Sequence, residues 1–181
     1  MMGAVHSGRV GAAVVIGAAL LSACSVIGGG GGDSAEAVLH DRTGAEVARA
    51  TLRPDGNQVR VDVTTTAIPA GTHGIHIHAV GSCQGPDFES AGGHFNPSNR
   101  AHGLENPAGP HNGDMVNMVV GPSEHTNYRS TSTHITLTTG AANLFDADGS
   151  ALVIHASADD QRTDPSGNSG ARIACGVIRA R

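Results

Sequence analysis

Alternation of apolar and polar residues in short runs is the dominant pattern from Ala35 to the C-terminus. The run Val59-Arg60-Val61-Asp62-Val63 is the clearest, because alternation places its three valines on one face of a β-strand. Turn-forming residues such as Pro54-Asp55-Gly56-Asn57 separate successive runs. This spacing predicts an all-β fold, an antiparallel sandwich or barrel of eight strands. The expected strands lie at 37–40, 46–52, 59–63, 74–80, 115–120, 132–138, 151–157 and 173–178.

Two stretches do not follow this alternation, namely residues 82–113 and the shorter polar segment 159–170. Long segments without a strand pattern inside a compact domain usually carry function, and the first one contains several histidines. Asp146-Ala147-Asp148-Gly149, between two predicted strands, has some acidic residues of a calcium-binding loop. The other ligand positions of an EF-hand are not filled, so we interpret this segment as a hairpin turn.

The first 34 residues have the pattern of a targeting segment followed by a linker. Arg9 precedes an apolar run at 10–20, which is shorter than the ~20 residues that a membrane-spanning helix needs. Leu21-Ser22-Ala23-Cys24 resembles a bacterial lipobox, in which the cysteine becomes the lipidated N-terminus. The alternative is an ordinary signal peptide with an incidental cysteine.

We therefore expect three parts: a lipoprotein signal peptide at 1–23, a lipidated Cys24 with a Gly-rich tether at 24–34, and a folded domain at 35–181. The protein would be exported and anchored to the outer face of the bacterial cell membrane, in the periplasm or cell envelope. Its only contact with the membrane would be the lipid on Cys24.

Composition and charge exclude one class of partner and favour another. The net charge is −5 and all 11 basic residues are arginines, with no basic run or stripe, which argues against nucleic acid as a partner. Eleven histidines stand against three phenylalanines, a ratio that favours metal binding. Removal of Arg9 with the signal peptide would leave a net charge of −6.

Cys83 and Cys175 are the two cysteines of the expected domain, and disulfides persist in exported proteins. They either pair with each other or both stay free thiols. A bridge between them would close a loop of about 90 residues and stabilise the domain by several kcal/mol in the chain-entropy model.

A His-x-His pair in Gly74-Ile75-His76-Ile77-His78 places two imidazoles on one face of a strand and two isoleucines on the other. His155 ends a distant strand, and all-imidazole sets suit copper. The long loop and the residues just after it offer a tetrahedral zinc set: His94, His102, His111 and Asp114. These seven side chains are enough for two metal sites if one ligand is shared. The spacing does not identify the shared ligand, and the alternative is that the loop histidines are simply solvated.

Taken together, these motifs resemble those of the copper–zinc superoxide dismutases, specifically the bacterial exported type. The resemblance runs from about Ala35 to the C-terminus. The motifs that carry it are Gly-Ile-His-Ile-His-Ala-Val-Gly from Gly74, Gly-Gly-His-Phe-Asn-Pro from Gly92, His102-Gly103, His111-Asn112-Gly113-Asp114, Val153-Ile154-His155, and the segment from Gly167 to Gly176.

The resemblance implies a Greek-key β-barrel of eight strands and two metal ions. The copper ligands would be His76, His78, His94 and His155. The zinc ligands would be His94, His102, His111 and Asp114. His94 would thus be the shared ligand, an imidazolate bridge.

Four further residues have roles that the resemblance implies. Asp159 would bond to one copper and one zinc histidine, because acceptors behind metal ligands orient their rings. Arg172 would sit beside the copper and attract the superoxide anion. Cys83 and Cys175 would form the disulfide that ties the metal loop to the last strand.

The function implied is dismutation of superoxide to dioxygen and hydrogen peroxide, by a redox-cycling copper bridged through His94 to a structural zinc. In the cell envelope this would protect against extracytoplasmic superoxide. The alternative is an inactive copper- and zinc-binding or metal-buffering lipoprotein with the same fold. Such a protein could lose Arg172, one copper ligand or Asp159 without penalty, but all of these residues are present. A zinc hydrolase is disfavoured because no HExxH motif is present. The family contains monomers and dimers, so a homodimer is compatible with the sequence.

The segment between Asp159 and Arg172 is shorter than in eukaryotic members of the family, whose longer loop carries charges that guide superoxide. Arg162 is its only other cation, and it either helps to guide superoxide or is a solvated loop residue. Arg172 must therefore attract the anion locally against the overall negative charge. Of the remaining histidines, we expect a local structural role for His73 and surface positions for His40, His125 and His134.

Overall fold

The computed structural model of the protein describes residues 1–4 and 34–181. The expected lipidation site at Cys24 and the Gly-rich tether up to Asp33 lie outside the described residues. Within the part that is described, no helix is long and apolar enough to cross a membrane.

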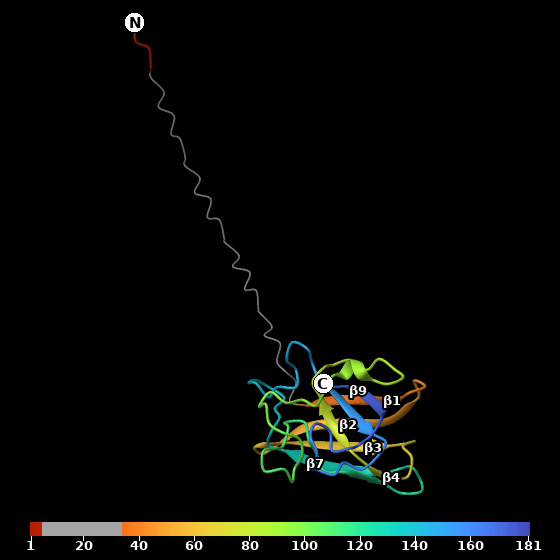
Figure 1. The fold of residues 1–181 in the computed structure, drawn as a ribbon. Coiled ribbons are helices and arrows are strands. Elements are labelled where there is room, and N and C mark those ends of the chain that lie inside the picture. Colours follow the sequence, from red (N-terminus) through yellow and green to blue (C-terminus); the bar gives the residue numbers. More distant parts are fainter. Residues whose placement is uncertain (5–33) are drawn as a thin grey trace. The chain divides into compact units, whose positions relative to one another are not determined.

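Antiparallel strands make up almost all of the regular structure in residues 34–181 (Figure 1). They are β1 (Ala35–Asp41), β2 (Glu46–Asp55), β3 (Gln58–Thr65), β4 (Gly71–His73), β5 (Ile75–His78), β6 (Met118–Val120), β7 (Asn127–Ser132), β8 (Ala151–His155), β9 (Arg172–Val177) and β10 (Arg179–Ala180). The one helix in this part of the chain is a single 3₁₀ turn, η1 (Glu89–Ala91).

The main sheet has the strand order β5-β8-β9-β1-β2-β3-β7, with β10 also paired to β1. Strands β1, β2, β3 and β9 lie side by side in Figure 1. The insertion of β8 and β9 between β5 and β1 requires the chain to cross over, which is the connectivity expected of a Greek-key fold. A second sheet pairs β4 with β6, and β4 runs directly into β5. The prediction of an all-β antiparallel fold is confirmed.

Alternation along the strands decides which side chains enter the core. Val59, Val61 and Val63 of β3 are buried, while Arg60 and Asp62 are only half-buried on the opposite face. In β5 the same period sends Ile75 and Ile77 into the core, as the sequence predicted. The histidines of β5 therefore face away from the core, toward the long loop that covers this strand.

One predicted strand is wrong. Residues 132–138 do not form a strand, and β7 lies earlier, at Asn127–Ser132. Ile135 and Leu137 are buried and alternate, which produced the prediction. Their segment makes a single isolated bridge, between Thr136 and Asn143, instead of a ladder. The alternation of buried residues in this segment therefore reflects packing against the core and not pairing with a neighbouring strand.

The hairpin turn predicted at 146–149 is confirmed only as a turn, because the strands on either side of it, β7 and β8, do not pair with each other. The backbone N–H of Gly149 donates to the carbonyl of Asp146 at 3.2 Å, and Gly149 has a φ of 65°, so residues 146–149 form a turn. The segment 82–113 contains no strand, and η1 is its one helical turn. Phe88 and Ala91 from this segment pack on Ala151 and Val153, which anchors the loop to the outer face of β8.

Candidate metal centre

Four histidines meet on the outer face of β5 and β8. His76 and His78 come from β5, and His155 ends the neighbouring strand β8. His94 joins them because its loop runs antiparallel along the free edge of β5, where His94 pairs with His78. One ring nitrogen from each of the four lies within 4.8 Å of the others. The family resemblance implied this set, and the structure brings all four together.

The nitrogens that face the middle of this cluster have no protein partner suited to them. His76 Nδ1 and His94 Nε2 are buried without any hydrogen bond. His78 Nε2 and His155 Nε2 face each other at 3.4 Å. Buried polar atoms normally find a partner, so four converging imidazole nitrogens fit a metal ion that accepts their lone pairs.

The opposite ring nitrogens are held by fixed acceptors. His78 Nδ1 donates to the Gly92 carbonyl at 2.9 Å, and His155 Nδ1 donates to the Gly170 carbonyl at 3.1 Å. His76 Nε2 lies 2.7 Å from Asp159 Oδ2. A proton on each of these nitrogens leaves the other nitrogen of the ring as a lone pair that points into the cluster.

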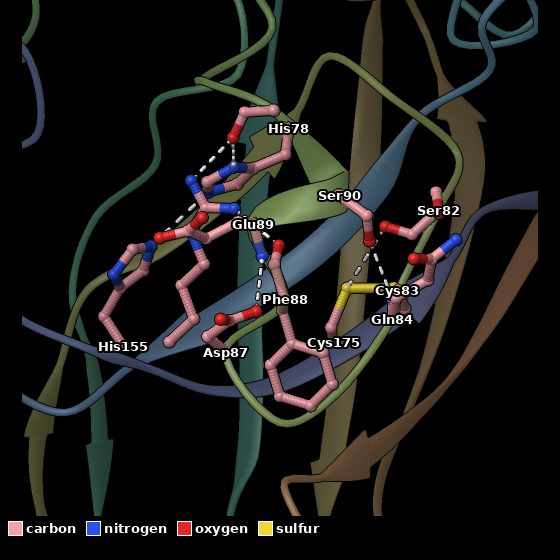
Figure 2. Close-up of a disulfide and its surroundings, with 12 residues drawn as sticks. His78, Ser82, Cys83, Gln84, Asp87, Phe88, Glu89, Ser90, His155 and Cys175 are labelled. Atoms are coloured by element: carbon pink, nitrogen blue, oxygen red, sulfur yellow. Dashed lines mark hydrogen bonds between the residues drawn. A yellow bond between two sulfur atoms is a disulfide. The ribbon is translucent and has the colours of Figure 1, made fainter.

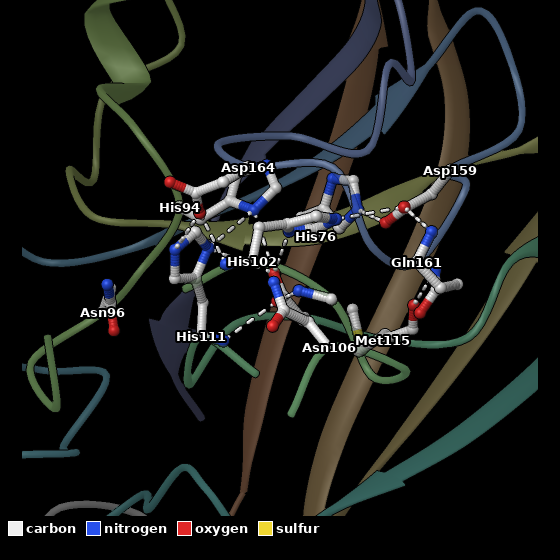
Figure 3. A network of polar contacts seen from close by, with 12 residues as sticks. His76, His94, Asn96, His102, Asn106, His111, Met115, Asp159, Gln161 and Asp164 are labelled. Carbon is white, nitrogen blue, oxygen red and sulfur yellow. Dashed lines mark hydrogen bonds and ion pairs between the residues drawn. The ribbon is translucent and has the colours of Figure 1, made fainter. Parts of the chain in front are cut away.

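A second cluster adjoins the first through His94 (Figure 3). Asp114 Oδ1 lies 2.9 Å from His94 Nδ1, 3.0 Å from His102 Nδ1 and 3.5 Å from His111 Nδ1. Asp114 Oδ2 is occupied by the backbone N–H groups of Gly103 and His111. Three imidazole nitrogens and one carboxylate oxygen form a closed set of the kind that zinc prefers. Asp114 reaches this position because it bridges to His76 on the edge of β5.

The carboxylate of Asp159 contacts one histidine of each cluster (Figure 3). Its Oδ2 contacts His76 Nε2 at 2.7 Å, and its Oδ1 contacts His102 Nε2 at 3.0 Å. The side chain of Asp159 is fully buried. One carboxylate thus orients a ring of each cluster, in the arrangement that the family resemblance implied.

Arg172 begins β9 and lies beside the first cluster. Its Nη1 donates to the Phe88 carbonyl and its Nη2 to the Gly92 carbonyl, each at 2.6 Å. The side chain is half-buried, so part of its charge faces solvent. The loop 82–113 therefore holds the guanidinium through neutral acceptors.

The disulfide Cys83–Cys175 is present, with a Cα–Cα distance of 5.6 Å (Figure 2). It connects the beginning of the metal loop to β9, three residues after Arg172. Figure 2 also shows His78 and His155 close to this loop. The predicted pairing is confirmed, and free thiols are excluded.

The clusters and the sheet can now be compared with known proteins. Residues 46–178 match the family model described as copper/zinc superoxide dismutase. The chain belongs to the copper/zinc superoxide dismutase family. Superoxide dismutase [Cu-Zn] 1 of Aquifex aeolicus is 40% identical over 141 residues, which cover 77% of this chain and 83% of that protein.

Solved structures agree with this membership. The crystal structure of a SOD-like protein from Bacillus subtilis is 41% identical, with a TM-score of 0.75, over 78% of this chain and 96% of that one. The Cu/Zn superoxide dismutase from Brucella abortus is 25% identical, with a TM-score of 0.66, over 81% of this chain and 99% of that one. Dismutation of superoxide is therefore the activity of this chain, and copper and zinc are its cofactors.

The pKa values of the histidines differ between the two clusters of the dismutase. Burial lowers the pKa of His76 to about 4 and that of His155 to about 3, and it also lowers the pKa of His78. Burial also acts to lower the pKa of His102, but hydrogen bonds to Asp114 and Asp159 outweigh it and raise this pKa to about 9. His76, His78 and His155 are thus neutral at pH 7, while His102 holds a proton in the metal-free protein.

Sequence reasoning missed two residues that position Asp159. The Asn117 side chain clamps its backbone, since Nδ2 donates to the Asp159 carbonyl and Oδ1 accepts from the Asp159 N–H, both at 2.8 Å. Gly167 lies so close that a Cβ there would collide with Asp159 Oδ1 and approach His102 Nε2. A lone Asn between Val116 and Met118 carries no signal of this role. Gly167 lies in one of the family motifs, but the motif does not indicate its close approach to Asp159.

The other histidines behave as expected. His73 is buried and its two ring nitrogens lie 2.7 Å from the His155 carbonyl and 2.9 Å from the Pro69 carbonyl, a local structural role. His40, His125 and His134 are exposed.

Proposed function

We propose that the two clusters divide the two metals between them. Copper is held by His76, His78, His94 and His155. Zinc is held by His94, His102, His111 and Asp114. The observation that carries this assignment is the placement of His94, whose Nδ1 faces Asp114 while its buried Nε2 has no protein partner. An all-imidazole set suits copper, and a set closed by a carboxylate suits zinc.

When bound, copper supplies the one-electron exchange that dismutation needs, and zinc, which is not redox-active, supplies a fixed charge beside His94. The rest of the task falls to the protein. Arg172 draws the superoxide anion to the copper-type cluster through the part of its charge that faces solvent. His94 Nε2 is the atom that can hold one of the two protons that reduced oxygen takes up to leave as hydrogen peroxide, and solvent supplies the other.

Element-resolved metal counting, paired with a superoxide assay, tests the assignment. We expect His155→Ala to lose copper and activity but keep zinc. We expect His111→Ala to lose zinc before it loses copper. His134→Ala, which removes an exposed imidazole, is the matched control. Retention of copper by His155→Ala would contradict the assignment. A wild-type protein with both metals and no activity would instead support the metal-buffering lipoprotein.

We also propose that the dismutase works in the cell envelope as a lipoprotein, where it removes extracytoplasmic superoxide. The support is the pattern Leu21-Ser22-Ala23-Cys24 after an apolar run, followed by a Gly-rich segment that can hold the domain away from a membrane. Cys24→Ser should move the protein from the membrane fraction to the soluble fraction, while Ser25→Ala should not. An unmodified N-terminus on wild-type protein, measured by mass spectrometry, would contradict lipidation.

A further inference from the structure

His111 differs from the other histidines of the two clusters in the surroundings of its outward ring nitrogen. Four rings have a protein acceptor at that nitrogen: His76, His78, His102 and His155. His94 turns one nitrogen toward each cluster. His111 Nδ1 lies 3.5 Å from Asp114 Oδ1, whereas its Nε2 makes no hydrogen bond within residues 34–181. A ligand ring normally depends on an outer partner to keep its orientation.

Asp164 is the one carboxylate of residues 34–181 within ion-pair distance of that nitrogen (Figure 3). Its Oδ1 lies 3.6 Å from His111 Nε2, which is longer than a hydrogen bond. The same oxygen accepts the backbone N–H of His102 at 2.6 Å. Asp164 therefore contacts two residues of the zinc-type cluster from the segment 159–170, which contributes no ligand to either cluster.

The protonation of a zinc-bound ring gives this contact a direction. A neutral imidazole carries one proton, so a zinc ion on His111 Nδ1 leaves that proton on Nε2, the nitrogen that faces Asp164. Asp159 already holds His102 in this manner, with its Oδ1 3.0 Å from His102 Nε2. Carboxylates behind metal-bound histidines fix the tautomer and the orientation of the ring. Asp164 has the same relation to His111 that Asp159 has to His102.

The segment that carries Asp164 is held in shape by its own hydrogen bonds. Asp160 Oδ1 accepts the backbone N–H groups of Arg162 and Thr163 at 2.9 and 2.8 Å, and Asp160 Oδ2 accepts Asn168 Nδ2 at 2.9 Å. Arg162 and Thr163 directly precede Asp164. The side chain of Asp164 is 58% exposed, but its backbone is thus fixed before any metal binds.

We propose that Asp164 is a positioning residue of the zinc site: its carboxylate accepts the Nε2 proton of His111 and keeps His111 Nδ1 directed at the metal. This inference rests on the proposed assignment of zinc to this cluster. Among residues 34–181, Asp164 makes no hydrogen bond or ion pair with a copper-type histidine, so its effect should be confined to zinc.

Zinc retention by the copper- and zinc-loaded full chain tests the proposal. Each variant is equilibrated with a chelator that buffers free zinc, and bound zinc and copper are counted in the same sample. We expect Asp164→Ala to bind zinc about tenfold more weakly than the wild type, with copper content unchanged. Asp164→Asn keeps an acceptor oxygen but loses the charge, so we expect a smaller loss of about threefold.

Glu105→Gln is the matched control. Glu105 forms an ion pair with Arg162 at 2.6 and 2.8 Å, so this variant also removes a negative charge and a link between the segments 82–113 and 159–170. Both side chains of the pair are exposed, and neither contacts a metal ligand. We expect Glu105→Gln to change zinc affinity less than about twofold. Equal zinc retention by Asp164→Ala and Glu105→Gln would overturn the proposal.

The ring proton of His111 separates positioning of this ring from support of the His102 backbone. In the zinc-loaded protein, the Nε2 proton of His111 should exchange with water slowly in the wild type and in Asp164→Asn, and faster in Asp164→Ala, as measured by ¹⁵N NMR. Weaker zinc binding with unchanged exchange would mean that Asp164 acts only through His102, and the proposal would be wrong.

The His111→Ala variant distinguishes failure of this inference from failure of the zinc assignment. If His111→Ala loses zinc while Asp164→Ala retains it, only the role of Asp164 is refuted. If His111→Ala retains zinc, the assignment of zinc to this cluster fails, and the role of Asp164 fails with it.

Discussion

His78 and Arg172 donate to the same acceptor, the carbonyl oxygen of Gly92, at 2.9 and 2.6 Å. One residue belongs to the copper-type cluster and the other is the cation beside it. Gly92 directly follows η1, in the loop that Cys83–Cys175 ties to β9. A single backbone group therefore sets the position of the guanidinium relative to the ring of a metal ligand.

This arrangement predicts that Arg172 contributes charge and not metal binding. Arg172→Gln should lower kcat/KM by about tenfold and flatten its dependence on salt, because the nearest cation is lost. Copper and zinc contents should stay unchanged, since His78 keeps its own bond to Gly92. Stopped-flow rates at several ionic strengths, together with metal counting, measure both effects.

Arg172→Lys is the matched control for that experiment. Lysine keeps the charge but cannot reach both carbonyls with a planar fork, so it should retain most of the salt dependence at a reduced rate. A Gln variant with the wild-type rate and salt slope would show that Arg172 does not attract superoxide.

Asp159 should be the most sensitive residue outside the ligand sets. Asp159→Asn replaces an acceptor for two imidazole N–H groups with a side chain that has only one acceptor, so one ring loses its orientation. Metal affinity should fall about 10- to 100-fold, as measured by competition with a chelator. Asp146→Asn, in an exposed turn, should have no effect. Equal affinities for the Asp159→Asn variant and the wild type would contradict a positioning role.

Zinc binding should release about one proton from His102 at pH 7.5, whereas His76, His78 and His155 should release none when copper binds. In the metal-free protein, the pKa of His102 is about 9, so its ring carries a proton at pH 7.5 that a zinc ion must displace. Burial keeps the pKa of His76 and His155 at about 4 and about 3, so these rings are already neutral.

Calorimetric titrations in two buffers with different ionisation enthalpies measure the number of protons released. The zinc value should shrink as the pH rises through 9, because His102 then deprotonates without metal. A zinc titration at pH 7.5 whose heat does not depend on the buffer would refute the prediction.

The disulfide should supply a large share of the stability of the metal-free domain. Cys83 and Cys175 are 92 residues apart, and the chain-entropy model assigns a loop of this length about 4–5 kcal/mol. Urea unfolding of the metal-free protein should show a lower midpoint after reduction, with a similar loss for the Cys83→Ala/Cys175→Ala double variant. Identical midpoints for the oxidised and reduced forms would rule out this contribution.

Local patterns in the sequence were sufficient for the strands that bury one face. The alternation in Val59–Val63 and in Ile75–His78 predicted which side chains enter the core, because successive residues of a strand point to opposite faces. The same rule failed at 132–138. There, Ile135 and Leu137 alternate in a segment that packs on the core without pairing to a neighbouring strand.

The sequence by itself determined the strand faces, the metal-ligand residue types and the family, since these depend on neighbours along the chain. Only the tertiary structure decided how His94 uses its two nitrogens, because that follows from a loop returning to the free edge of β5. The clamp of Asn117 on Asp159 has the same origin. It joins segments that are more than 40 residues apart, and no spacing rule along a chain reports such a contact.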